Sequence, residues 1–177
     1  THDGMMIHVG TRCLHFADTP GHALHHHCIW DEASAGWFTG DTFGLSYREF
    51  DTARGPWLLP TTTPVQFEPE ALRASVQRLL SYEPQSMYLT HYGRVGDVAR
   101  LGAMFLEQLD SMVQLGESLR GQPDRHAALK LGLGALYREQ LQRQGCTMGE
   151  TQALELLALD IELNAQGMGI WLDKEAA

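Results

Sequence analysis

The pattern of apolar residues changes near residue 93, and this change constrains the fold more than any other feature of the sequence. Before it, short apolar runs alternate with turns rich in glycine and proline. After it, apolar residues recur every three or four positions, the spacing of amphipathic helices. We therefore expect an α/β layer over residues 1–93, with a helical extension over residues 94–177 packed on it.

Five short strands are predicted from runs of β-type residues at 5–9, 12–17, 26–30, 37–39 and 86–90. One helix is predicted between the last two strands, starting near Pro69 and ending before Pro84. Proline suits the first position of a helix, and the flanking glutamates face the positive end of its dipole. Further helices are expected after residue 97, and Gly167 and Gly169 are expected to interrupt the last one.

A stretch of about 25 residues, 42–66, has no clear period. A loop of this length inside a compact domain is usually functional or flexible. Trp57, Leu58 and Leu59 could line a pocket, although packing in the core is the interpretation we favour.

Composition and charge exclude several classes of function. Of 177 residues, 44% are hydrophobic and 20% charged, which is typical of a globular protein. The net charge is −9 and the sequence has no basic cluster, which argues against nucleic acid or an anionic membrane as the main partner. No apolar run approaches the roughly 20 residues of a membrane span.

The three cysteines, Cys13, Cys28 and Cys146, have no CxxC spacing. We expect reduced thiols, with the first two buried in strands, and this favours a cytoplasmic location. The sequence begins with Thr1, so the lack of a signal peptide says little about targeting.

Three residues that could bind metal each follow an apolar run that reads as a strand. They are His22, Asp41 and His91. Neutral imidazole and carboxylate groups are zinc ligands, and ligands of open sheets gather where strands end. Each residue alone would be read as an ordinary turn residue. Together they predict one metal site.

The order of these motifs resembles the metallo-β-lactamase-fold hydrolases, in particular the glyoxalase II-like (hydroxyacylglutathione hydrolase-like) branch. The similarity lies in Thr19-Pro20-Gly21-His22, in Phe38-Thr39-Gly40-Asp41-Thr42 and in Leu89-Thr90-His91. The spacing of 19 positions from His22 to Asp41 and 50 from Asp41 to His91 is also similar to that of the family. The resemblance covers roughly residues 5–93.

The resemblance implies an αββα sandwich with two divalent metal ions at one edge, zinc first, with iron or manganese as alternatives. His22 would bind one metal, His91 the other, and Asp41 would bridge both. A metal-bound hydroxide would attack an ester, thioester or lactone carbonyl while a metal polarises the carbonyl oxygen.

The chain departs from the family in one respect, because no His-x-His-x-Asp-His motif precedes His22. We therefore expect the chain to be only the second, C-terminal half of the fold, holding one metal ion or none and inactive by itself. The other half could be missing from this sequence, cleaved, supplied by another chain, or absent in nature.

Two alternatives to a carbonyl hydrolase stay open. The first is a non-catalytic remnant that binds a partner or forms a homodimer through the faces left uncovered. The second is a phosphodiesterase on the same fold, which would need basic residues near the site, and this acidic chain has few.

Other polar residues near these motifs have weaker assignments. Of His25, His26 and His27, at most the first and last share a strand face, and His26 is expected to lie behind the metal and orient His22 or Asp41. Tyr47 and Arg48 could contact substrate, with the arginine pairing with a carboxylate, or could lie in a solvated loop. No pattern assigns a role to His2, His8, His15 or His126.

Overall fold

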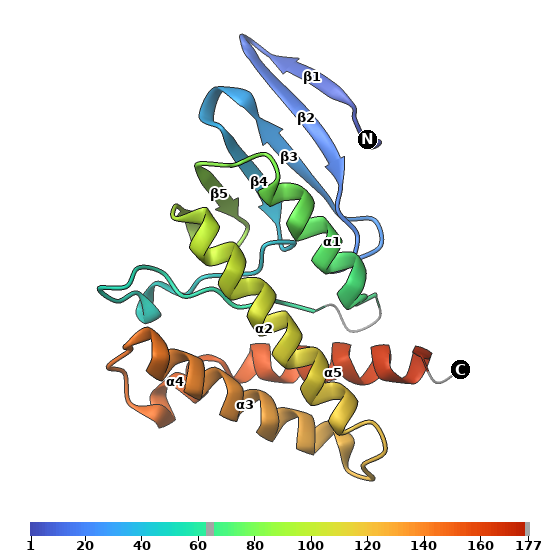
Figure 1. Ribbon diagram of the computed structural model, residues 1–177, viewed down its shortest axis with the longest axis vertical. Helices are drawn as coiled ribbons and strands as arrows, with labels where there is room; N and C mark the ends of the chain where they lie inside the picture. Colours follow the sequence, from blue (N-terminus) through green and yellow to red (C-terminus); the bar gives the residue numbers. More distant parts are fainter. Residues whose placement is uncertain (63–65, 176–177) are drawn as a thin grey trace.

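The computed structural model of the chain describes residues 1–62 and 66–175 and shows one six-stranded sheet with helices beside and beneath it (Figure 1). The spatial order of the strands follows the sequence, and among the hydrogen-bonded neighbours of the described sheet only β4 and β5 pair in parallel. The strands are β1 (Met6–Val9), β2 (Arg12–Asp18), β3 (His27–Asp31), β4 (Gly36–Gly40), β5 (Ser86–Leu89) and β6 (Gly93–Val95).

Helix α1 lies in the connection between the parallel strands β4 and β5, because parallel neighbours need a long crossover. Two short 3-10 turns, η1 (Glu32–Ser34) and η2 (Arg48–Phe50), follow β3 and β4. The α-helices are α1 (Pro69–Leu80), α2 (Val98–Ser118), α3 (Arg125–Gln144), α4 (Glu150–Leu156) and α5 (Ala158–Glu175).

One face of the sheet packs against α1 and α2. Cys28, Trp37 and Met87 point to this face from three neighbouring strands, and all three are fully buried. The indole Nε1 of Trp37 donates a hydrogen bond of 3.1 Å to the carbonyl of Leu79, which ties the end of α1 to the centre of the sheet. Apolar burial and this bond together fix the helix over β3–β5.

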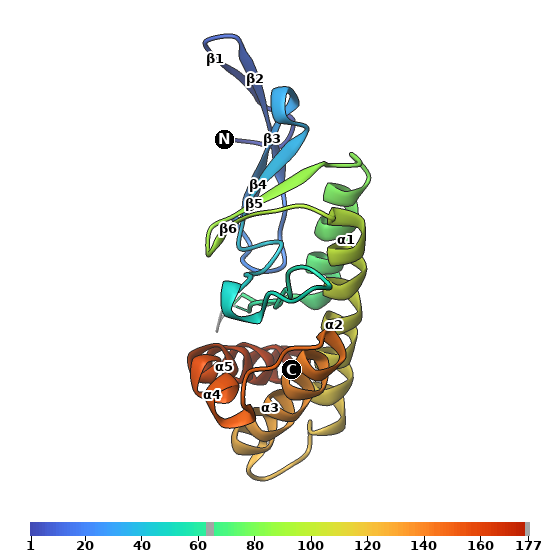
Figure 2. The same ribbon diagram turned by 90° about the vertical axis from the view of Figure 1, so that its left-hand side faces the viewer.

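No helix of the described residues covers the opposite face of the sheet (Figure 2), and this face carries apolar side chains from β2, β3 and β4. Phe38 is 45% exposed, and its ring stacks on that of Tyr88 with centroids 4.8 Å apart. Leu14 and Ile29 lie on the same face and are half-buried. The described residues thus form one sheet with helices on one face.

The long loop is packed into the core, as we favoured for its apolar residues. Trp57, Leu58 and Leu59 are fully buried, which confirms that prediction. The loop pairs with itself through a Leu45–Leu59 bridge, and Trp57 meets Tyr137 of α3 edge-on at 6.2 Å. One continuous hydrophobic cluster therefore runs from the sheet through this loop to the helices. Residues 63–65 of the loop lie outside the described part.

All five predicted strands are present, although the third begins at His27 rather than His26. Strand β6 was missed, because its three residues, Gly93-Arg94-Val95, are too few to show alternation. Helix α5 continues through Gly167 and Gly169, so the expected interruption is wrong. A glycine costs a helix only about 1 kcal/mol relative to alanine, and the burial of α5 offsets that cost.

None of the helices in the described residues combines the length and the apolar character needed to cross a membrane. The expected burial of Cys28 is confirmed, whereas Cys13 is only half-buried in β2.

The Cys28 thiol should resist modification in the folded chain. Burial raises the pKa of Cys28 to about 11, so only on the order of one thiol in a thousand is ionised at pH 8. An alkylating reagent at pH 8 should label Cys13 and Cys146 in the native, metal-free protein, and Cys28 only after unfolding, as measured by peptide mass spectrometry. Native labelling of Cys28 at the rate of Cys146 would contradict this packing.

Candidate metal centre

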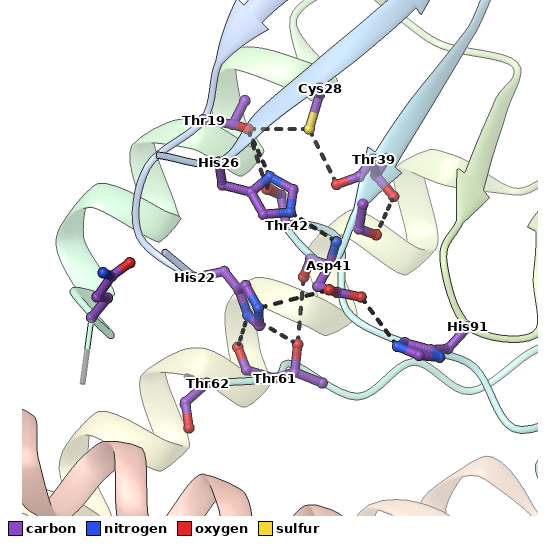
Figure 3. A network of polar contacts seen from close by, with 12 residues as sticks. Thr19, His22, His26, Cys28, Thr39, Asp41, Thr42, Thr61, Thr62 and His91 are labelled. Atoms are coloured by element: carbon purple, nitrogen blue, oxygen red, sulfur yellow. Dashed lines mark hydrogen bonds and ion pairs between the residues drawn. The ribbon is translucent and has the colours of Figure 1, made fainter. Parts of the chain in front are cut away.

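The direction of three strands brings the predicted ligands to one edge of the sheet. Strand β2 is antiparallel to β3, β3 is antiparallel to β4, and β4 is parallel to β5, so β2, β4 and β5 point the same way. Asp41 directly follows β4, His91 comes two residues after β5, and His22 lies in the turn after β2. Their side chains therefore converge, as Figure 3 shows.

Each histidine faces a different oxygen of the same carboxylate. The Nε2 atom of His22 lies 3.8 Å from Oδ2 of Asp41, and the Nε2 atom of His91 lies 3.5 Å from Oδ1. Two ligand atoms about 2.1 Å from one tetrahedrally coordinated zinc stand about 3.4 Å apart. Both separations are close to that value, so a cation would fit between each histidine and its oxygen.

The Asp41 carboxylate has one atom whose burial calls for an explanation. Its Oδ1 atom is buried and has no hydrogen-bond partner within the described residues. A buried acceptor without a partner costs roughly 1–3 kcal/mol, and more when it is charged. A bound cation would remove that cost, so the donor set and the environment of Asp41 both suit a divalent metal.

The ring of His22 is held by a residue that the sequence did not single out. Its Nδ1 atom lies 3.0 Å from the carbonyl oxygen of Thr61 and 3.3 Å from the Thr61 hydroxyl. Donation from Nδ1 to the carbonyl leaves Nε2, on the Asp41 side, as the atom with the lone pair. Histidines that bind metal are usually oriented by such a bond.

His26 lies directly behind Asp41 and supports its backbone. The Asp41 N–H donates to Nε2 of His26 at 3.2 Å, so the proton of the neutral ring is on Nδ1, 3.0 Å from the Thr42 hydroxyl. That hydroxyl donates in turn to Thr19 at 3.2 Å. Burial, with a smaller contribution from nearby His22, lowers the pKa of His26 and keeps the ring neutral.

The two histidines next to His26 in the sequence, His25 and His27, are not among the labelled residues of this network (Figure 3). His25 is exposed in the turn before β3, and the ring of His27 packs 5.7 Å from that of Phe16.

Tyr47 and Arg48 both brace the loop that carries His91. The Arg48 guanidinium donates to the carbonyls of Tyr92, at 2.6 and 3.0 Å, and of Arg94, at 2.8 Å. The ring of Tyr47 lies 4.5 Å from that of Tyr92. Contact of either residue with a substrate stays a prediction.

Asp160 of α5 reaches this region from the far end of the sequence. The Tyr47 hydroxyl donates to its Oδ2 atom at 2.7 Å, and burial raises the pKa of Asp160. No sequence pattern indicated this contact, because 113 positions separate the two residues.

Replacement of Gly40 should disturb His26 and thereby Asp41. Gly40 has φ +52°, and an added Cβ would lie 2.3 Å from Cε1 of His26. Gly10 is a matched control, because it has φ +61° and nothing lies within 4 Å of an added Cβ. Gly10→Ala should therefore cost about 1–2 kcal/mol from backbone strain alone.

Gly40→Ala should cost about 1–3 kcal/mol more than Gly10→Ala, because the ring of His26 must move. Urea unfolding of the two variants measures the difference. Equal losses would show that His26 is not held against Gly40.

Solved structures of similar shape show the fold. No family model matches the chain, and no curated protein matches it. A metallo-β-lactamase family protein from Thermus thermophilus aligns with 100% of this chain at 16% identity and a TM-score of 0.63. A metallo-β-lactamase superfamily protein from Sulfolobus tokodaii aligns with 93% of it at 22% identity and a TM-score of 0.55.

The alignment covers 49% of each of those two proteins, so the chain spans about half of their length. At these identities the likeness shows the fold alone. The chain has the mixed α/β fold of metallo-β-lactamase family proteins.

Proposed function

We propose that the chain carries part of the active site of a metal-dependent hydrolase, with Asp41 bridging two divalent cations. His22 binds one cation and His91 the other. Zinc is the first choice of metal, because imidazole and carboxylate are its usual nitrogen and oxygen ligands, and iron or manganese are alternatives.

This proposal rests on the position of the Asp41 carboxylate between two histidines. Its Oδ2 atom faces His22 and its Oδ1 atom faces His91, at separations of 3.8 and 3.5 Å. A carboxylate that served only as a turn residue would not need an imidazole at each oxygen. The buried Oδ1 atom without a hydrogen-bond partner in the described residues supports the same interpretation.

Neighbouring residues hold these three ligands in position. Thr61 fixes the ring of His22, His26 holds the backbone N–H of Asp41, and Arg48 holds the loop that carries His91. When bound, divalent cations in such a site activate water and polarise a carbonyl oxygen. The substrate proposed is a small molecule with an ester, thioester or lactone carbonyl.

Three ligands are too few for two cations, since even one zinc is usually held by three or four protein groups. The remaining ligands in this proposal come from a part of the fold that the solved structures have and that these 177 residues do not match. A complete site would then form with that part, on the same polypeptide or on another.

The ligand assignments can be tested by counting bound zinc after equilibrium dialysis at a fixed free concentration. His22→Ala, Asp41→Ala and His91→Ala should each weaken binding at this site at least about tenfold, because even losing a residue behind the ligands usually costs 10–100-fold. His126→Ala is the control, because His126 is exposed and pairs with Glu162 of α5. If the Asp41→Ala variant bound as much zinc as the His126→Ala control, the bridging role of Asp41 would be refuted.

A second function is favoured by the uncovered face of the sheet. Phe38 is 45% exposed and Leu14, Ile29 and Tyr88 are half-buried around it. Large apolar patches on soluble proteins usually mark interaction sites. The alternative is a non-catalytic module that forms a homodimer through this face.

Phe38→Glu should dissociate such a dimer, because two buried charges would face each other across the interface. Light scattering after size exclusion should show a dimer for the unmodified chain and a monomer for this variant. Leu131→Glu, at a residue 78% exposed on α3, should leave the dimer intact. A monomeric unmodified chain would reject the homodimer.

A further inference from the structure

A second group of metal-type side chains lies at the opposite end of strand β2 from the site described above. Cys13 and His15 alternate along β2 and so share one face, and Glu32 approaches them from η1. The Sγ atom of Cys13 lies 3.5 Å from Nε2 of His15, which lies 2.8 Å from Oε1 of Glu32. All three ligand atoms lie within 4.8 Å of one another.

We propose that Cys13, His15 and Glu32 form a second zinc site, separate from the Asp41 centre. Thiolate, imidazole and carboxylate are the donors that zinc accepts. Sulfur and nitrogen atoms bound to one tetrahedral zinc stand about 3.6 Å apart, close to the separation of Cys13 and His15. In a tetrahedral zinc site the carboxylate oxygen of Glu32 would stand about 3.4 Å from the imidazole nitrogen of His15. The glutamate must therefore move away from the histidine by about half an ångström.

The pair of Cys13 and His15 is fixed by the sheet, whereas Glu32 has room to adjust. The side chain of His15 is 29% exposed and that of Glu32 is 59% exposed. The η1 turn is anchored beside them, because buried Asp31 accepts hydrogen bonds from Arg12 at 3.2 Å and from Ser34 at 2.5 Å. Glu32 therefore starts from a fixed backbone position and moves only its flexible side chain.

His8 supplies the fourth ligand. In the antiparallel pair of β1 and β2, His8 lies directly opposite Cys13, so both side chains point to the same face of the sheet. Opposed residues of such a pair have Cβ atoms about 4.5–5.5 Å apart. The side chain of His8 is exposed and can rotate toward the thiol. Four ligands from β1, β2 and η1 complete the tetrahedral set of a structural zinc site.

The two metal centres are distinguishable by their chemistry and their position. Cys13 and Asp18 are five positions apart on β2, which places the new site on the order of 17 Å from the strand end that leads to His22. The Asp41 centre contains no sulfur ligand among the residues proposed for it. A spectroscopic signal that requires a thiolate therefore reports on the new site alone.

Cobalt(II) titration of the metal-free chain, kept reduced with a non-thiol reductant, tests the proposal. One equivalent should produce the near-ultraviolet thiolate-to-cobalt charge-transfer band, which zinc should then displace. Cys13→Ser should abolish the band, whereas Cys146→Ser, at another half-buried thiol, should keep it. Asp41→Ala should also keep it. Absence of the band in the unmodified chain, or its survival in Cys13→Ser, would overturn the proposal.

Two further variants test the remaining ligands without touching the buried core. Glu32→Gln and His8→Ala change exposed side chains, and each should weaken cobalt binding at this site at least about tenfold. Circular dichroism of both variants checks that they fold. Unchanged affinity in either variant would remove that residue from the ligand set.

Discussion

The shared direction of β2, β4 and β5 is the constraint on which the candidate metal centre depends. Because these strands point the same way, the residues that follow them gather at one edge of the sheet, although His22 and His91 are far apart in sequence. The crossover through α1 makes this arrangement possible, since β5 could not otherwise lie parallel to β4. The burial of Trp37 under α1 holds that crossover in place.

Behind the candidate metal centre, a row of hydrogen-bonded polar groups holds the residues that follow the strands in position. The contacts from His26 through Thr42 to Thr19 are short and largely buried, so the Asp41 backbone has one defined position. A network in which every member has a partner is rigid, because any break would leave a buried polar group unsatisfied. Within the described residues, the Oδ1 atom of Asp41 has no hydrogen-bond partner, and our proposal assigns a metal to this atom.

The helices beneath the sheet belong to the same hydrophobic core. The loop that carries Trp57 and Leu59 joins sheet and helices, and Asp160 of α5 reaches Tyr47 near the His91 loop. Residues late in the sequence therefore shape the surroundings of ligands contributed by residues 22–91. The predicted division at residue 93 falls at the start of β6, five residues before α2 begins, and the core is continuous across it.

The sequence by itself determined five of the six described strands and the helix α1, and it singled out His22, Asp41 and His91 as candidate ligands, because periodicity and turn residues are local signals. It missed β6, which is too short to show a period. Only the tertiary structure assigned one histidine to each oxygen of Asp41, placed Thr61 on His22, and joined Cys13 and His15 to Glu32. Those contacts depend on how distant segments pack, and no local pattern encodes which side chains will meet.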